Sequence, residues 1–357
     1  MISNGYKISV ITQFDGYEKK LKNIGCQVYN LFISRKGINP FLDIITLIQL
    51  FFQLLFLRPF CCLTFTIKPV LYVCFVSRIL NISNIAMITG LGTGFIRGGW
   101  LTILVEKLYR YALVKASCVF FQNPSDQQLF WDNNLVDHFK CKLTPGSGID
   151  LQKYALSKKG NDSNTFIFLL IARLVWDKGI KEYLKAARQL QEEFPEVQFH
   201  VIGPSDVQNR TAIPRSEIEN WKQEGVINYL GEVEDVRGKI AEATCIVLPS
   251  YREGTSRVLL EASAIGRPII ATDVPGCKEV VLDEKSGFLC KVKNSHDLYL
   301  KMKKMYLLDQ VKRNEMGLIG RAHVENKFNH ELVCQIYLDT LFGLSSKTKK
   351  NYQFEKK

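Results

Sequence analysis

Two cations that could bind an anion stand close together in the second half of the chain. Arg173 and Lys178 follow an apolar run at 166–172, which predicts a β-strand. In a parallel α/β sheet, ligands bind at the carboxyl ends of the strands, which is where these side chains would lie. A guanidinium gives forked hydrogen bonds and an ammonium gives a compact charge, so the pair suits a diphosphate. Ordinary surface charges are the alternative.

A second group of reactive side chains lies between a predicted strand at 245–249 and a predicted helix at 256–265. Glu253 precedes this helix and Glu261 lies inside it. Free amides at a helix start bind anions, and Gly254 allows a ligand to come close to the backbone. Because two carboxylates do not help to bind phosphate alone, we expect phosphate at the amides and sugar hydroxyls at the carboxylates. The alternative is that both carboxylates are solvated charges at a helix end. Their position after a strand argues against this alternative.

The elements around these residues alternate between strand and helix, as in parallel sheets with helices on both faces. In the first half the pattern predicts strands at 7–12, 62–66, 84–88 and 117–121, and helices at 41–57, 69–80, 99–115 and 124–133. In the second half it predicts strands at 166–172, 197–203, 226–230, 245–249, 268–272 and 287–292, and helices at 179–194, 236–243, 256–265 and within 296–342. The polar run at 157–164 separates the two halves. We therefore predict two doubly wound α/β domains with a cleft between them.

Composition agrees with this arrangement. The chain has 357 residues, of which 46% are hydrophobic and 23% charged, and this excludes a disordered or fibrous chain. The charge is uneven, because residues 1–145 contain 15 Lys and Arg against 7 Asp and Glu. A basic domain attracts anionic lipid, phosphorylated ligands or nucleic acid. No nucleic-acid-binding motif accompanies the charge, so we expect no nucleic acid partner.

The run at 41–57 is the most apolar part of the chain. It is shorter than a typical membrane span, and Asp43, Gln49 and Gln53 interrupt it. We expect a helix packed on a sheet. A transmembrane helix and a helix lying on an anionic membrane surface are the alternatives.

Taken together, these residues resemble a known enzyme family. The residues that carry the resemblance are Arg173, Lys178, Glu253, Glu261, Gly276, Glu279, Gly287 and Phe288. In this order they resemble the retaining GT-B glycosyltransferases of family GT4. The segments 34–40, 65–69, 88–92 and 145–150 resemble its bacterial surface-glycan branch. That branch includes capsule and O-antigen enzymes and an N-acetylgalactosaminyltransferase that acts on undecaprenyl-diphosphate-bacillosamine.

The resemblance implies a role for each matching residue. Arg173 and Lys178 would neutralise the diphosphate of the donor, and Glu253 would contact the donor sugar during catalysis. Glu261 would bind the ribose. The donor would also meet the backbone around Gly254, Thr255, Ser256 and Val258. Arg257 could touch the diphosphate or form a salt bridge. The resemblance implies neither a metal nor another cofactor.

The implied activity is transfer of a hexose or N-acetylhexosamine, with retention, from a UDP-sugar to a polyprenyl-diphosphate-linked glycan. Such an enzyme would be cytoplasmic and peripheral on the inner face of the cytoplasmic membrane, where it would touch anionic lipid. The alternatives are a truncated homologue that binds nucleotide sugar without transfer, and a nucleotide-sugar epimerase on the same fold.

The resemblance also predicts domain limits. We expect an acceptor-side Rossmann-like domain at 1–145 and a nucleotide-sugar-binding domain at 146–330. A helix at 331–346 would pack back towards the first domain, and a basic tail at 347–357 would be disordered. The first domain departs from the family in two ways: Thr89-Gly90 stands where many relatives have His-Gly, and its first strand, within a βα unit of roughly 25 residues, is expected to be missing.

Overall fold

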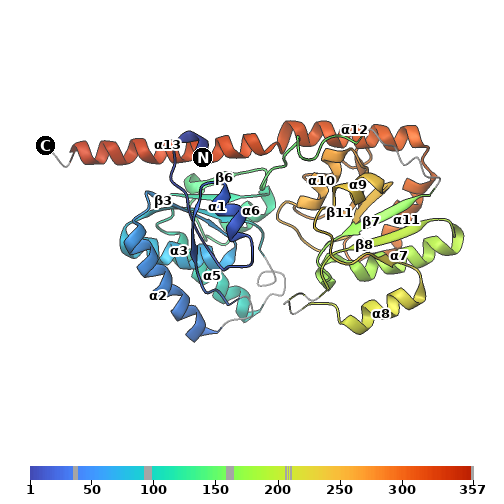
Figure 1. The fold of residues 1–357 in the computed structure, drawn as a ribbon, viewed down its shortest axis with the longest axis horizontal. Helices are drawn as coiled ribbons and strands as arrows, with labels where there is room; N and C mark the ends of the chain where they lie inside the picture. The colour runs from blue at the N-terminus through green and yellow to red at the C-terminus, as the bar shows by residue number, and fades with distance from the viewer. Residues whose placement is uncertain are drawn as a thin grey trace. The chain divides into compact units, whose positions relative to one another are not determined.

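The computed structural model describes residues 1–34, 39–91, 99–157, 165–205, 207, 209 and 211–354. The chain divides into two compact units (Figure 1). Unit 1 comprises Met1–Phe121, Asp126–Thr144 and Cys334–Lys357, and unit 2 comprises Gln122–Ser125 and Pro145–Val333. Parts of the motifs at 34–40 and 88–92 and most of the polar run at 157–164 lie outside the described residues.

Unit 2 is built on a six-stranded sheet with the order β12-β11-β10-β7-β8-β9. Every pair of neighbouring strands is parallel. The strands are β7 (Ile167–Ile171), β8 (Gln198–Ile202), β9 (Asn228–Tyr229), β10 (Cys245–Leu248), β11 (Ile269–Thr272) and β12 (Gly287–Cys290). The strand order reverses between β7 and β10, so the loops that follow these two strands flank the switch point where such sheets bind ligands.

Helices cover both faces of this sheet (Figure 1). One layer contains α7 (Ile180–Glu193), α8 (Arg215–Glu224) and α11 (Ser295–Leu307), and the other contains α9 (Arg237–Glu242), α10 (Arg257–Ile265) and α12 (Gln310–Lys327). Side chains of a strand alternate between the faces. Accordingly, Phe168 and Leu170 of β7 pack in the first layer, whereas Leu169 and Ile171 pack in the second. Both faces are apolar, as expected of a buried parallel sheet.

Unit 1 contains two parallel sheets. The larger has the order β3-β4-β5-β6, and the smaller pairs β1 with β2. The strands are β1 (Ser9–Thr12), β2 (Gln27–Asn30), β3 (Cys61–Phe65), β4 (Ser83–Ile88), β5 (Cys118–Phe121) and β6 (Cys141–Leu143). In the described part of the chain, β1 and β2 pair with no strand of the larger sheet. The expected loss of a preceding strand stays a prediction.

The helices of unit 1 are α1 (Glu18–Asn23), α2 (Pro40–Leu57), α3 (Ile67–Leu80), α5 (Trp100–Leu113), α6 (Pro124–Asp132) and, from Cys334 onward, α13 (His330–Phe354). Helix α3 packs between α2 and α5. Helix α13 is held to the larger sheet through Tyr337, whose ring centroid lies 5.0 Å from that of Phe120. Lys142 of β6 donates a hydrogen bond of 3.1 Å to Thr340.

The alternating α/β pattern and the parallel sheets that the sequence predicts are confirmed. Among the described residues, the α-helices and strands that were not predicted are α1, β2, β6 and α8. Only Ile218 and Trp221 are buried in α8, so its apolar periodicity is weak. Strand β6 has three residues with no buried side chain. Helix α13 continues to Phe354, and the disorder expected of the tail at 347–357 stays a prediction. After Gly343 the helix meets no glycine or proline that would end it.

Helix α2 differs from the expected helix packed on a sheet. Only Thr46, Leu50 and Leu54 are buried, so the helix contacts its unit along one narrow face. Among the described helices it is the one long and apolar enough to cross a membrane, by length and composition alone. Its most apolar stretch is 17% buried, far less than in a core helix.

Candidate active site

The two loops at the switch point of unit 2 carry the residues that the sequence singled out. Arg173 and Lys178 lie between β7 and α7, and Glu253 lies between β10 and α10. The fold therefore brings together segments that are far apart in the sequence. Each loop begins at the carboxyl end of its strand, as the sequence predicted.

The first loop ends in a tight turn that rests on the second. Gly179 has φ +71°, and a Cβ atom there would lie 1.9 Å from the carbonyl oxygen of Pro249. The amide of Tyr251 donates a hydrogen bond of 2.9 Å to the carbonyl oxygen of Asp177. Glycine is thus required at 179, because only a residue without a side chain lets the loops touch.

Lys178 and Glu253 meet across this contact and form an ion pair. Their side chains are 19% and 14% exposed, respectively, so the pair is shielded from water without being sealed from it. An ammonium group has three donors, and it can therefore hold this carboxylate while it contacts a further anion. The arrangement places a cation and a carboxylate at one point of the switch.

Arg173 is not part of this pair. Its side chain is exposed, and in the described structure it makes no hydrogen bond or ion pair. Its position after β7 is as predicted, whereas its contact with a ligand stays a prediction.

The loop that carries Glu253 is also supported by the loop after β11. Gly276 has φ +83°, and a Cβ atom there would lie 2.4 Å from the carbonyl oxygen of Gly254. The amide of Glu253 donates to Pro275 over 3.2 Å, and that of Ser256 donates to Gly276 over 3.1 Å. Three loops therefore fix the backbone beside the Glu253 carboxylate.

The start of α10 differs in detail from the predicted set of free amides. The amide of Thr255 donates a hydrogen bond of 3.0 Å to the side-chain oxygen of Gln122. The amide of Ser256 donates a hydrogen bond to the carbonyl oxygen of Gly276. A ligand would have to replace these bonds. The amide of Val258 lies in the first turn, where a helix has no internal acceptor, and Ser256 makes no side-chain cap. The amides that stay available at the start of α10 are thus those of its first turn rather than the amide of Thr255.

Glu261 is buried, with 6% of the residue exposed. Its Oε1 accepts hydrogen bonds from the Tyr154 hydroxyl at 2.8 Å and from the Arg257 guanidinium at 2.9 Å. Burial and the bond to this carboxylate raise the pKa of Tyr154. Neither bond uses Oε2, which leaves an acceptor for a ligand hydroxyl. Of the two alternatives for Arg257, the structure contains the salt bridge.

Sequence reasoning missed three residues that build this site: Gln122, Asn123 and Tyr154. Asn123 is buried and donates a hydrogen bond of 3.1 Å to the carbonyl oxygen of Gly254. Gln122 and Asn123 directly follow β5, so polar residues at the end of a strand were the available signal. No local pattern marks Tyr154, because its partner Glu261 is more than 100 residues away.

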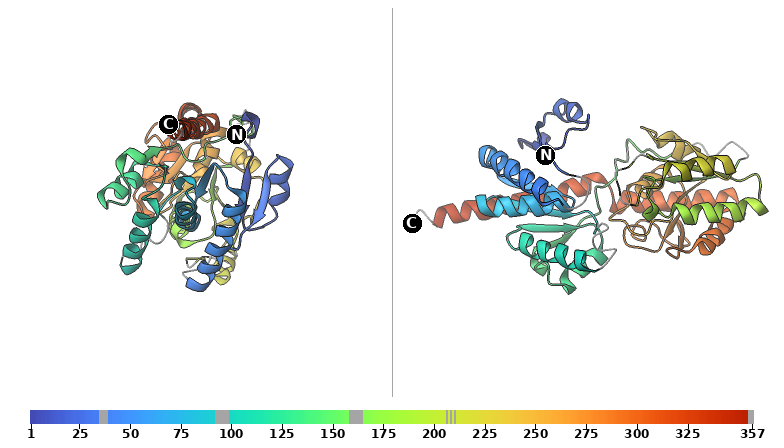
Figure 2. Two further views of the ribbon diagram at one scale, coloured as in Figure 1. Left: turned by 90° about the vertical axis from the view of Figure 1, so that its left-hand side faces the viewer. Right: turned by 90° about the horizontal axis from the view of Figure 1, so that it is seen from below.

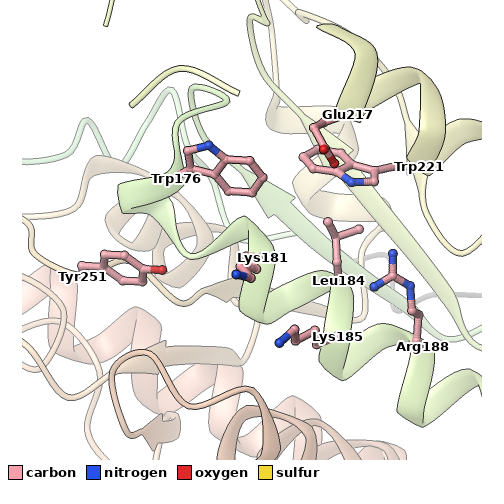
Figure 3. Close-up of a pocket in the computed structure, with 8 residues that line it drawn as sticks. All are labelled: Trp176, Lys181, Leu184, Lys185, Arg188, Glu217, Trp221 and Tyr251. Atoms are coloured by element: carbon pink, nitrogen blue, oxygen red, sulfur yellow. The ribbon is translucent and has the colours of Figure 1, made fainter. Parts of the chain in front are cut away.

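A separate pocket of about 580 Å³ lies between α7 and α8 of unit 2 (Figure 3). Lys181 and Lys185 project into it from α7 and Trp221 from α8, while Trp176 and Tyr251 come from the two site loops. The predicted donor-binding residues do not line it. In the described part of the chain, no group of three His, Cys, Asp or Glu side chains could hold a metal ion.

Comparisons with known proteins agree with the fold. A family model of glycosyl transferases group 1 matches residues 153–323, which include both site loops. The chain is 26% identical to N,N'-diacetylbacillosaminyl-diphospho-undecaprenol alpha-1,3-N-acetylgalactosaminyltransferase of Campylobacter jejuni, over 93% of this chain and 90% of that protein. It is 27% identical to UDP-Gal:alpha-D-GlcNAc-diphosphoundecaprenol alpha-1,3-galactosyltransferase of Escherichia coli, over 64% of this chain and 59% of that protein.

A solved structure shares the whole fold. The Anabaena protein HepE in complex with UDP and glucose is 18% identical, with a TM-score of 0.77 and coverage of 95% of this chain and 93% of that one. The chain therefore has the fold of the GT-B glycosyltransferases. Residues 153–323 match the group 1 glycosyltransferases, and the resemblance to family GT4 drawn from the motifs is confirmed.

The contact between the two site loops can be tested with a matched pair of glycine variants. Gly179 and Gly225 have almost the same φ, +71° and +70°, but a Cβ atom at Gly225 would meet nothing within 4 Å. Gly225→Ala should cost about 1–2 kcal/mol of unfolding free energy through backbone strain alone. Gly179→Ala should cost about 1–3 kcal/mol more because of the clash with Pro249. Equal losses in denaturant unfolding would contradict the close contact.

Proposed function

We propose that this enzyme transfers a hexose or N-acetylhexosamine from a UDP-sugar to a polyprenyl-diphosphate-linked glycan during surface polysaccharide or glycoprotein glycan assembly. The observation that carries the proposal is the Lys178–Glu253 ion pair at the switch point of unit 2. It offers one group for a diphosphate and one for a sugar at the same place.

Two sources of positive charge would bind the diphosphate of the donor. Lys178, with Arg173 nearby in sequence, would bind the diphosphate together with the first-turn amides of α10. Charge develops on the diphosphate as the glycosidic bond breaks, so fixed donors stabilise the leaving group most in the transition state. UDP as the donor nucleotide is supported by the Anabaena relative, whose structure contains UDP and glucose, and by the E. coli relative, which is named for UDP-Gal.

Two carboxylates would bind the hydroxyls of the donor. Glu253 would accept hydrogen bonds from hydroxyls of the donor sugar, and Glu261 would accept them from the ribose through Oε2. The bond between the anomeric carbon and the phosphate oxygen breaks, and UDP leaves with the electron pair. The acceptor hydroxyl attacks the same face and gives its proton to the leaving phosphate oxygen, so the anomeric configuration is retained.

The proposed identity of the acceptor is supported by two relatives. The name of each includes a sugar linked to diphospho-undecaprenol. The excess of Lys and Arg in residues 1–145 also suits an acceptor that bears a diphosphate at an anionic surface.

The role of Glu253 predicts a variant that separates binding from transfer. Glu253→Gln keeps an oxygen that can accept from Lys178, so UDP should bind with wild-type affinity in titration calorimetry. Transfer, followed as UDP release in the presence of a lipid-linked acceptor, should fall by about 10²–10³-fold because a transition-state contact is lost. Glu219→Gln, on the exposed side of α8, is the control and should behave as wild type. Near-normal turnover of Glu253→Gln would remove this residue from the site.

The role of Lys178 predicts a loss of donor affinity. Lys178→Ala should weaken UDP binding by about 10–100-fold, the size expected for one charge-assisted hydrogen bond. Lys181→Ala is the matched control, since Lys181 is exposed three residues later in the chain and lines the separate pocket. Equal affinities of the two variants would make Lys178 an ordinary surface charge. UDP binding without transfer to any acceptor tested would favour a non-catalytic homologue, and conversion of the UDP-sugar without an acceptor would favour an epimerase.

A further inference from the structure

Helix α2 of unit 1 carries a continuous apolar stripe on its outer side. The stripe consists of Phe41, Ile44, Ile45, Ile48, Phe52 and Phe56, each at least 51% exposed. Steps of three and four residues place all six on one side of the helix, opposite the buried Leu50 and Leu54. A surface helix of a globular protein normally has the reverse pattern, with polar residues outside.

The polar side chains of α2 all point to its own unit. Asp43 pairs with Lys68 at 2.9 Å, and Thr46 donates a hydrogen bond of 2.8 Å to the carbonyl oxygen of Phe32. Gln49 and Gln53 both donate to the carbonyl oxygen of Asn30, at 2.9 and 2.7 Å. The residues that interrupt the apolar run in the sequence are therefore the ones that fasten the helix. A helix fastened in this way along its length lies against its unit and does not cross a bilayer on its own.

Helix α3 lies beside α2 and α5 (Figure 2), and exposed apolar side chains occur on all three helices. Phe75 and Ile79 are exposed on α3, and Trp100 and Ile103 are exposed on α5. The ring centroids of Phe75 and Tyr111 lie 6.2 Å apart and connect these two helices. Exposed apolar side chains thus occur on three adjacent helices, which is more than single scattered residues.

Cations accompany this surface. Arg58 ends α2, Arg78 lies in the last turn of α3 and Lys107 lies on α5, and all three are exposed. Arg78 lies 4.7 Å from the centre of the Tyr111 ring, within the apolar surface itself. The one acidic residue of α2, Asp43, is already paired with Lys68. Apolar side chains beside exposed cations are the pattern of a protein surface that binds anionic lipid.

We propose that the outer face of α2 binds the surface of an anionic bilayer, with the apolar stripe inserted at the boundary between head groups and acyl chains. Arg58, Arg78 and Lys107 would contact the phosphates of the head groups. A second copy of the chain fits this face less well, because protein interfaces contain hydrogen-bonding groups among their apolar side chains. The stripe offers no polar side chain from Phe41 to Phe56, and the acyl layer of a membrane requires none.

Vesicle flotation with the full chain tests this proposal through a matched pair of variants. Phe56 and Phe139 are 83% and 84% exposed, but only Phe56 belongs to the stripe. Wild type and Phe139→Glu should float with vesicles of phosphatidylcholine and phosphatidylglycerol, and less with phosphatidylcholine alone. Phe56→Glu should bind at least about tenfold more weakly, and Ile48→Glu/Phe52→Glu more weakly still.

Other results would overturn the proposal. Wild-type affinity of all stripe variants would show that the stripe does not touch lipid. An absence of vesicle binding, combined with a dimer that Phe56→Glu converts to a monomer, would assign the face to a second copy. Retention of the chain in vesicles after an alkaline carbonate wash would indicate a spanning helix. Flotation requires neither donor nor acceptor, and UDP affinity of each variant is measured separately, so failure here leaves the proposed transfer reaction standing.

Discussion

The ion pair between Lys178 and Glu253 is the constraint on which the site depends. It exists because β7 and β10 are neighbours in the sheet although the chain between them forms two further strands and three helices. The two loops can meet only where Gly179 leaves room for the carbonyl of Pro249. The order of the strands and the glycine at position 179 thus place a cation beside a carboxylate. In the proposed function the diphosphate of the donor would use the cation and its sugar would use the carboxylate.

Helix α10 adds two further functions to the same place. In the proposed function its first turn would present amides to an anion, and one turn later Glu261 would present a carboxylate to a hydroxyl. The burial of Glu261 is made possible by Tyr154 and Arg257, which satisfy one of its oxygens. A helix that begins at a switch point can therefore bind a phosphate at its end and a hydroxyl on its side, at a spacing fixed by the helical period.

Much of this arrangement follows from local sequence patterns. Apolar runs followed by charged or glycine-rich segments predict strands and the loops at their carboxyl ends, and sheet topology then brings those loops together. The bond from Thr255 to Gln122 and the bond from Tyr154 to Glu261 could not be predicted in this way. Each joins residues more than 100 positions apart, so which amide is occupied and which oxygen is satisfied depends on tertiary packing. The same holds for α2, because polar side chains normally mark the exposed side of a surface helix, whereas here they fasten the helix to its own unit.

A crystal structure of the full chain with UDP tests the central claim most directly. The account predicts that the diphosphate contacts the Lys178 ammonium and the first-turn amides of α10, and that a ribose hydroxyl donates to Oε2 of Glu261. Thr255 would then keep its hydrogen bond to Gln122. UDP bound in the pocket between Trp176 and Trp221, or at the switch point with its diphosphate away from Lys178, would contradict the account.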